Sequence, residues 1–187
     1  ILEQDDPNAR ADYDILSKLG QGGMGVVYAA RQASIDRTVA IKMLKPKGAA
    51  DPNQRNKFLS EAVITGELEH PNIVPIYDLG HNDENALFYA MKRVQGTPWN
   101  DAIRHKSLAE NLEIFMKCCD AVAFGHSRGI IHRDLKPENV MLGDYGEVLV
   151  MDWGLALPFG EHAKSRTVKT HASMGGTPAY MAPEMAT

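Results

Sequence analysis

Short runs of β-forming residues, not helical periodicity, open the chain. Strands are expected where apolar and β-branched residues gather between turn residues, as in Thr38-Val39-Ala40-Ile41. The expected strands are residues 13–20, 25–32, 37–44, 76–79 and 86–94. Residues 1–12 read as a polar lead-in and residues 45–50 as a loop. The pattern predicts a sheet in the first half of the chain.

A single helix interrupts these strands. Asp51 is a typical capping residue before a first-turn proline, and Gln54 follows three residues after it. Apolar and small residues then recur at helical spacing, at Phe58, Ala62, Thr65 and Leu68. His70-Pro71-Asn72 is expected to end the helix.

The second half begins with a longer helix, after a hinge near residues 95–97. Ser107 and Glu110 form a capping-box pattern, and Gly129 marks an end close to Arg128. One face of this helix is lined by Leu108, Leu112, Phe115, Cys119, Val122 and His126. Short strands are expected at residues 140–142 and 147–151, with a long loop from Asp152 onward.

Composition narrows the class of protein. The 187 residues carry 20 Lys and Arg against 24 Asp and Glu, which argues against a dedicated nucleic-acid binder. No apolar run reaches membrane-spanning length, so no membrane contact is expected from this segment. The adjacent Cys118 and Cys119 exclude a disulfide framework and fit a reducing, cytoplasmic setting, and both are expected to be buried or half-buried.

A glycine-rich loop lies between the first two expected strands. Gly20, Gly22 and Gly25 leave room for backbone N–H groups to approach phosphates, although a plain hairpin turn explains them equally well. A dinucleotide-binding fingerprint needs a helix directly after the glycines, and a strand is expected there instead.

Lys42 ends the next apolar strand, where it is placed to contact a phosphate. A buried ammonium needs a partner, and Glu61 on the capped helix is the candidate. Glu67 is the alternative, but its place near the helix end favours a solvated face.

The strongest signals lie further along. Ile131-His132-Arg133-Asp134-Leu135-Lys136-Pro137-Glu138-Asn139 combines a carboxylate, a cation and an amide within nine residues. Asp152-Trp153-Gly154 offers a second carboxylate, and Gly176-Thr177-Pro178 begins a run that ends in Ala182-Pro183-Glu184. Each fragment alone could be a polar loop, but their order together is specific.

In this order the motifs resemble the protein kinase family, and the bacterial Hanks-type Ser/Thr kinases most closely, from about Tyr13 to Glu184. The resemblance implies an α+β bilobal fold. Residues 13–94 would form an N-lobe of five antiparallel strands and one helix, and residues 95–187 the hinge and the first part of a mainly helical C-lobe.

The resemblance implies transfer of the ATP γ-phosphate to a Ser or Thr hydroxyl of a protein substrate, with Mg²⁺ or alternatively Mn²⁺. Asp134 would orient the hydroxyl and accept its proton, Lys136 would contact the γ-phosphate, and Thr177 would brace both. The implied catalytic residues are Lys42, Glu61, Asp134, Lys136 and Thr177, and the metal ligands are Asn139 and Asp152.

The resemblance also implies a nucleotide site. Its residues are Gly20, Gly22, Gly25 and Lys42 at the phosphates, Leu19, Val27 and Ala40 above the adenine, Met141 below it, Met91 as gatekeeper, and Lys92 to Val94 as the hinge. Arg133 implies activation by phosphorylation of the loop, with Thr167, Thr170 and Ser173 as the candidate acceptors.

Two residues depart from the family pattern. Trp153 replaces the usual Phe, and Thr65 replaces an apolar residue. Both belong to the apolar stack that aligns the lobes. Trp153 is still expected to fill an apolar slot beneath the helix that carries Glu61. The hypothesis is that the active arrangement is easily lost without a stabilising partner or phosphate.

The sequence stops shortly after Glu184, where the family continues with further C-lobe helices. We therefore expect open apolar surface on the 108–128 helix and around Tyr180, which favours association, a homodimer included. This piece alone could be inactive, and a parent protein could be membrane-anchored with the kinase domain in the cytoplasm. The rival interpretations are a pseudokinase or ATP-binding scaffold and a small-molecule kinase of related fold.

Overall fold

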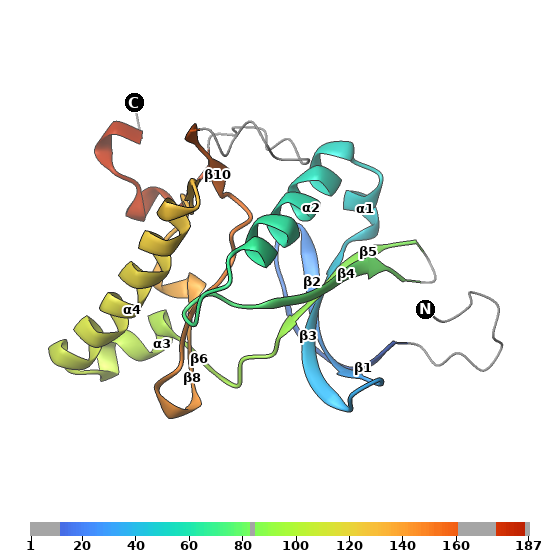
Figure 1. Ribbon diagram of the computed structural model, residues 1–187, viewed down its shortest axis with the longest axis horizontal. Helices are drawn as coiled ribbons and strands as arrows, with labels where there is room; N and C mark the ends of the chain where they lie inside the picture. Colours follow the sequence, from blue (N-terminus) through green and yellow to red (C-terminus); the bar gives the residue numbers. More distant parts are fainter. Residues whose placement is uncertain (1–11, 83–84, 161–174, 186–187) are drawn as a thin grey trace.

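A five-stranded antiparallel sheet forms the first half of the protein in the computed structural model, which describes residues 12–82, 85–160 and 175–185 (Figure 1). The strand order is β1-β2-β3-β5-β4. The strands are β1 (Tyr13–Gln21), β2 (Gly25–Gln32), β3 (Arg37–Leu44), β4 (Ile76–His81) and β5 (Leu87–Lys92). All five expected strands are present, and β2 and β3 have the expected bounds.

Two helices cover one face of this sheet (Figure 1). The Asp51 side chain caps α2 (Pro52–Glu67) by accepting a hydrogen bond from the backbone N–H of Asn53 at 2.9 Å. The expected loop at 45–50 was wrong, because it contains the short helix α1 (Pro46–Ala49). Pro46 stands at its first position, where the fixed φ of proline suits a helix start.

The second half combines helices with very short strands. Its helices are α3 (Trp99–Ala102) and α4 (Leu108–Ser127), and its strands are β6 (Gly96–Pro98), β7 (Ile130–Ile131), β8 (Val140–Gly143), β9 (Val148–Val150) and β10 (Leu157–Pro158). β6, β8 and β9 form one sheet, and β7 pairs with β10. The loop expected from Asp152 onward therefore holds a strand, β10. Within the described ranges, no helix has both the length and the apolar character needed to cross a bilayer.

The buried face of α4 is not the face that carries its larger apolar side chains. The capping box at Ser107 is formed, but the buried residues are Ile114, Cys118, Ala121 and Gly125. Small side chains on this face let the helix approach β7 and β9 closely. The larger Leu108, Leu112 and Phe115 are 76%, 51% and 54% exposed.

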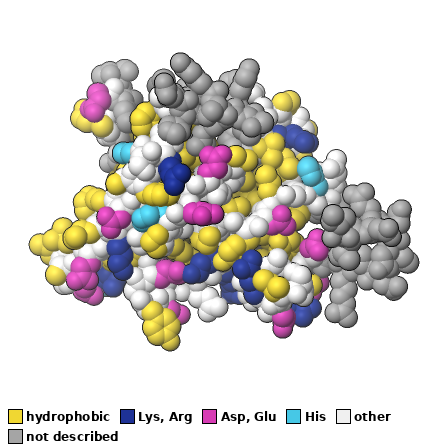
Figure 2. All heavy atoms as spheres, viewed as in Figure 1, with side chains coloured by type: hydrophobic (Ala, Val, Ile, Leu, Met, Phe, Trp, Pro, Cys, Tyr) yellow, Lys and Arg dark blue, Asp and Glu magenta, His cyan; other side chains and the backbone are white. Residues whose placement is uncertain are grey.

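Open apolar surface on α4 was expected, and Figure 2 shows hydrophobic side chains gathered along the outer edge of this helix. Tyr180 is likewise 52% exposed. The expectation that both cysteines are buried or half-buried was wrong for Cys119, which is exposed, whereas Cys118 is buried.

The connection from α2 to β4 joins the two halves. The Asn72 side chain donates to the Val148 carbonyl at 2.9 Å, and the backbone N–H of Val150 donates to the Asn72 carbonyl at 2.8 Å. The Lys92 ammonium pairs with Glu147 across the same junction. The sheet of the first half is thereby tied to β9 of the second.

Trp153 belongs to the cluster of buried residues that forms the core of the second half, and 1% of its surface is exposed. It shares a cluster of buried residues with Ile64 and Leu68, so the expected apolar slot beneath α2 is present. Gly125 of α4 makes room for the ring, because a Cβ there would lie 3.1 Å from a ring carbon of Trp153. A glycine opposite the indole thus compensates for the large side chain.

This packing predicts coupling between Gly125 and Trp153. Gly125→Ala should be about 1 kcal/mol more favourable for stability in a Trp153→Phe background than in the wild type, because the smaller ring leaves space for the added methyl. Urea unfolding of the four proteins of the cycle measures this difference. Additive effects of the two substitutions would contradict the interpretation.

Candidate active site

Lys42 and Glu61 form a buried ion pair between β3 and α2. The Lys42 Nζ lies 2.6 Å from Glu61 Oε1, and the two side chains are 15% and 3% exposed. Burial alone would lower the pKa of Lys42, but the charges of Glu61 and Asp152 outweigh it and raise the pKa above its usual value. The ammonium therefore stays charged. Glu67, the alternative partner, lies on the exposed side of α2.

Tyr89 on β5 belongs to the same cluster and was not predicted from the sequence. Its hydroxyl donates a hydrogen bond to Glu61 Oε1 at 2.7 Å. Burial and the charge of Glu61 raise the pKa of Tyr89 well above its usual value, so the phenol stays protonated. The cross-strand register, which places Lys42 opposite Tyr89, is the feature that would have revealed it.

A second cluster surrounds Asp134. The Thr177 hydroxyl donates to Asp134 Oδ1 at 2.7 Å and accepts a hydrogen bond from Lys136 Nζ at 2.7 Å. Lys136 Nζ also lies 2.9 Å from Asp134 Oδ2. Asn139 Nδ2 donates to the Asp134 carbonyl at 2.8 Å and to its Oδ2 at 3.2 Å. The structure thus brings together four of the predicted site residues.

These bonds keep the Asp134 carboxylate ionised. Partial burial would raise its pKa, but the hydrogen bonds from Lys136, Thr177 and Asn139, together with the charge of Lys136, lower the pKa below its usual value. Asp134 is therefore an ionised hydrogen-bond acceptor at neutral pH.

His132 holds the backbone of the loop that carries Asp134. Its Nδ1 accepts the backbone N–H of Asp134 at 3.2 Å, and its Nε2 lies 3.0 Å from the Met151 carbonyl. Burial lowers the pKa of His132, so the ring is neutral and the Nε2 hydrogen faces the carbonyl. The ring also packs edge-on against Trp153, with centroids 4.6 Å apart. The loop that carries Asp134 thus packs, through His132, on the buried cluster that contains Trp153.

Asp152 approaches Glu61 across Gly154. A Cβ at Gly154 would lie 3.2 Å from both Asp152 Oδ1 and Glu61 Oε2, so an added methyl group would crowd both carboxylates. Asp152 itself has a φ of 57°, a left-handed conformation that turns the chain at this point. No cluster of three or more His, Cys, Asp or Glu with metal-binding geometry occurs in the described ranges.

The glycine loop is held by a residue that the sequence did not single out. Lys45 Nζ donates to the Gly22 carbonyl at 2.6 Å, which ties the turn between β1 and β2 to the end of β3. Gly20 and Gly22 have open space where a Cβ would stand, whereas a Cβ at Gly25 would lie 2.8 Å from the Met43 carbonyl.

The residues expected around adenine are only partly gathered. Val27, Ala40 and Met91 belong to one apolar cluster between the sheet and α2. Leu19 on β1 is 47% exposed and Met141 lies on β8, both outside that cluster. β5 ends at Lys92, so Val94 follows the strand as part of the connection.

Arg133 adopts a left-handed conformation with a φ of 69°, and its Nε donates to the Leu155 carbonyl at 2.6 Å. The expected phosphate acceptors Thr167, Thr170 and Ser173 lie outside the described residues.

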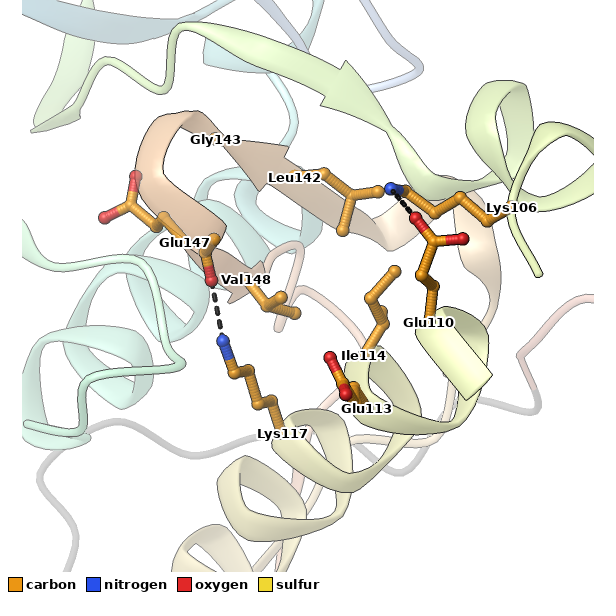
Figure 3. Close-up of a pocket in the computed structure, with 10 residues that line it drawn as sticks. Lys106, Glu110, Glu113, Ile114, Lys117, Leu142, Gly143, Glu147 and Val148 are labelled. Carbon is orange, nitrogen blue, oxygen red and sulfur yellow. Dashed lines mark hydrogen bonds and ion pairs between the residues drawn. The ribbon is translucent and has the colours of Figure 1, made fainter. Parts of the chain in front are cut away.

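The hollow drawn in Figure 3 lies elsewhere, between α4 and the turn that joins β8 to β9. Its volume is about 280 Å³, and none of the predicted site residues lines it. Two of its cations are already engaged, since Lys117 donates to the Gly146 carbonyl at 2.7 Å and Lys106 pairs with Glu110 at 3.5 Å. We therefore do not assign the active site to it.

Comparison with known proteins identifies a family that this chain matches. Residues 13–187 match the family described as protein kinase domain. The serine/threonine-protein kinases PknD of Protochlamydia amoebophila and Chlamydia pneumoniae are 37% and 36% identical over 93% and 92% of the chain. The chain spans only 20% and 21% of the length of these relatives.

A solved structure agrees with this match. The crystal structure of the Mycobacterium tuberculosis PknI kinase domain is 32% identical and aligns with a TM-score of 0.65, covering 77% of this chain and 60% of that one. The bilobal fold expected from the sequence is confirmed. The chain belongs to the protein kinase family.

Proposed function

We propose that this chain is the catalytic part of an ATP-dependent protein kinase that phosphorylates Ser and Thr hydroxyls. One observation carries the proposal: Thr177, from the segment near the C-terminal end, bonds to both Asp134 and Lys136. This bridge joins the segment that would face a peptide to the carboxylate and the cation that the reaction needs. The Ser/Thr kinases among its relatives support this choice of acceptor.

Phosphoryl transfer asks the protein mainly for positioning and for neutralisation of charge. Lys42, held by Glu61, would contact the α- and β-phosphates, and the glycines at 20, 22 and 25 would cover them. Asp134 would accept a hydrogen bond from the acceptor hydroxyl, orient its oxygen toward the γ-phosphate and receive its proton. Lys136 lies beside Asp134, where it would offset the charge on the transferred group.

Asn139 and Asp152 fit a divalent cation shared with the nucleotide. Mg²⁺ is usually held by one or two protein oxygens together with substrate phosphates, so a site of few protein ligands suits it. The Asn139 nitrogen bonds to Asp134, which leaves its amide oxygen for a cation. We assign Mg²⁺ as the preferred ion, with Mn²⁺ as the alternative. When bound, the ion neutralises phosphate charge.

The nucleotide base would lie against Val27, Ala40 and Met91, with the backbone from Lys92 to Val94 reading its edge. Leu19 and Met141 would close the two sides. The partner is a protein with a Ser or Thr acceptor, and the proposed location is the cytoplasm, which the unpaired cysteines favour. For regulation we propose phosphorylation at Thr167, Thr170 or Ser173, with Arg133 near the new charge.

Replacing Asp134 tests the reaction itself. Incubation with ATP and Mg²⁺ should add phosphoryl groups to the wild-type chain or to a Ser/Thr peptide, and Asp134→Asn should slow this by about 10²–10⁴-fold because the acceptor of the proton is lost. Intact-mass spectrometry measures the gain. Asp144→Asn, the same change on an exposed turn, is the matched control. ATP binding with no transfer in the wild type would favour the ATP-binding scaffold instead.

The cation assignment predicts metal-dependent nucleotide affinity. Mg²⁺ should strengthen ATP binding to the wild type but much less to Asp152→Asn, since the substitution removes the ligand charge. Calorimetric titrations with Mg²⁺, Mn²⁺ and chelator measure the difference, with Asp120→Asn on the exposed side of α4 as the control. Equal gains in both variants would show that Asp152 does not hold the ion.

The regulatory assignment predicts where phosphate first appears. Peptide mapping after incubation with ATP should find modification at Thr170 and Thr167 before other positions. Phosphorylation at these two positions should raise the kinase activity of the wild type during the incubation. A variant with both Thr167→Ala and Thr170→Ala should show no such rise, because Arg133 would have no phosphate to pair with. Modification confined to other segments of the chain would refute this assignment.

A further inference from the structure

Tyr89 and Lys42 form a pair of hydrogen-bond donors on one face of the sheet. They are directly opposite each other in the antiparallel pairing of β3 and β5, so their side chains point to the same side. Glu61 descends from α2 onto this pair, and its Oε1 accepts from Lys42 Nζ at 2.6 Å and from the Tyr89 hydroxyl at 2.7 Å. One carboxylate oxygen thus joins a helix to two strands.

The position of the phenol is set by packing. Tyr89 is 3% exposed, and its ring lies against Phe58 of α2 with centroids 5.1 Å apart. A buried hydroxyl without a partner would be costly, and Glu61 supplies that partner. The hydroxyl cannot turn toward solvent, so its bond to Glu61 is fixed by the same core that holds α2 on the sheet.

The buried carboxylate of Glu61 depends on few hydrogen-bond donors. The residue is 3% exposed, and its other oxygen, Oε2, has no hydrogen-bond partner within the described part of the chain. Within the described residues, the hydrogen bonds of this carboxylate therefore fall on Oε1, from Lys42 and Tyr89. Removing either donor leaves a buried charge with a single bond, and removing both leaves it with none.

We propose that Tyr89 is a positioning residue that keeps Glu61 bonded while the Lys42 ammonium turns toward the nucleotide phosphates. The inference rests on the proposed function, in which Lys42 is shared between Glu61 and ATP. Tyr89 makes this sharing inexpensive, because its hydroxyl stays with Glu61 whichever way Lys42 points. In its absence, Lys42 would be the one remaining donor of Glu61 in the described residues, so any turn of the ammonium toward phosphate would weaken the hold on the carboxylate.

The test combines Tyr89→Phe with Glu61→Ala. Tyr89→Phe removes one oxygen and keeps the packing against Phe58. ATP affinity in the presence of Mg²⁺, measured by calorimetry, should fall about tenfold in this variant, the size expected for an unsatisfied buried charge. In a Glu61→Ala background the same substitution should change affinity less than about twofold, since no carboxylate remains to be satisfied.

Tyr13→Phe is the matched control. The Tyr13 hydroxyl also donates to a carboxylate, Asp78, at 3.1 Å, but this bond is exposed and joins β1 to β4, the two outer strands of the same sheet. Its loss should leave ATP affinity unchanged. An equal loss of affinity from Tyr89→Phe in both Glu61 backgrounds would show that the hydroxyl acts independently of Glu61, which would overturn the proposal.

Urea unfolding of the same four proteins without nucleotide separates this inference from the proposed function. Non-additive effects of Tyr89→Phe and Glu61→Ala on the unfolding midpoint are expected, and additive effects would overturn the proposed coupling. If the wild type bound no ATP, the proposed function would fail, while non-additive unfolding would still support the hold of Tyr89 on Glu61.

Discussion

A negative charge buried between a sheet and a helix constrains the whole first half of this protein. Glu61 lies in an otherwise apolar layer, and an unpaired carboxylate there would be strongly destabilising. It is tolerated only because β3 and β5 present Lys42 and Tyr89 side by side. The placement of α2 and the register of β3 and β5 must therefore agree for the carboxylate to be satisfied.

The second half of the chain also contains a carboxylate, Asp134, whose oxygens are satisfied by neighbouring side chains. Asp134 is contacted by Lys136, Thr177 and Asn139, and none of these three residues lies on a strand or an α-helix. His132 supports the loop that carries Asp134 by bonding to the backbone on either side, with its neutral ring packed on Trp153. The backbone of the loop is therefore held in position by the buried cluster that contains Trp153.

The sequence predicted local secondary structure better than packing. Glycines, a β-branched run and a capped helix are local signals, so the strands β2 and β3 and the start of α2 were found. β7 and β10 have two residues each, which is too short for periodicity to detect. The inward face of α4, with Ile114, Cys118, Ala121 and Gly125, was not singled out, because the helix is apolar on several sides and only its neighbours decide which residues face inward. Tyr89 was missed because its role arises from register, which no single strand reveals.

The two departures from the family pattern are each matched by a local adjustment. The Thr65 hydroxyl is buried but donates to the Glu61 carbonyl at 2.7 Å, whereas the buried Trp153 Nε1 has no hydrogen-bond partner within the described residues. Trp153 is accommodated by Gly125. α2 contributes Glu61 to the ion pair and Ile64 to the cluster around Trp153, so a shift of this helix would disturb both at once. Formation of the ion pair and packing of the indole are therefore parts of one structural state, because the same rigid helix carries both.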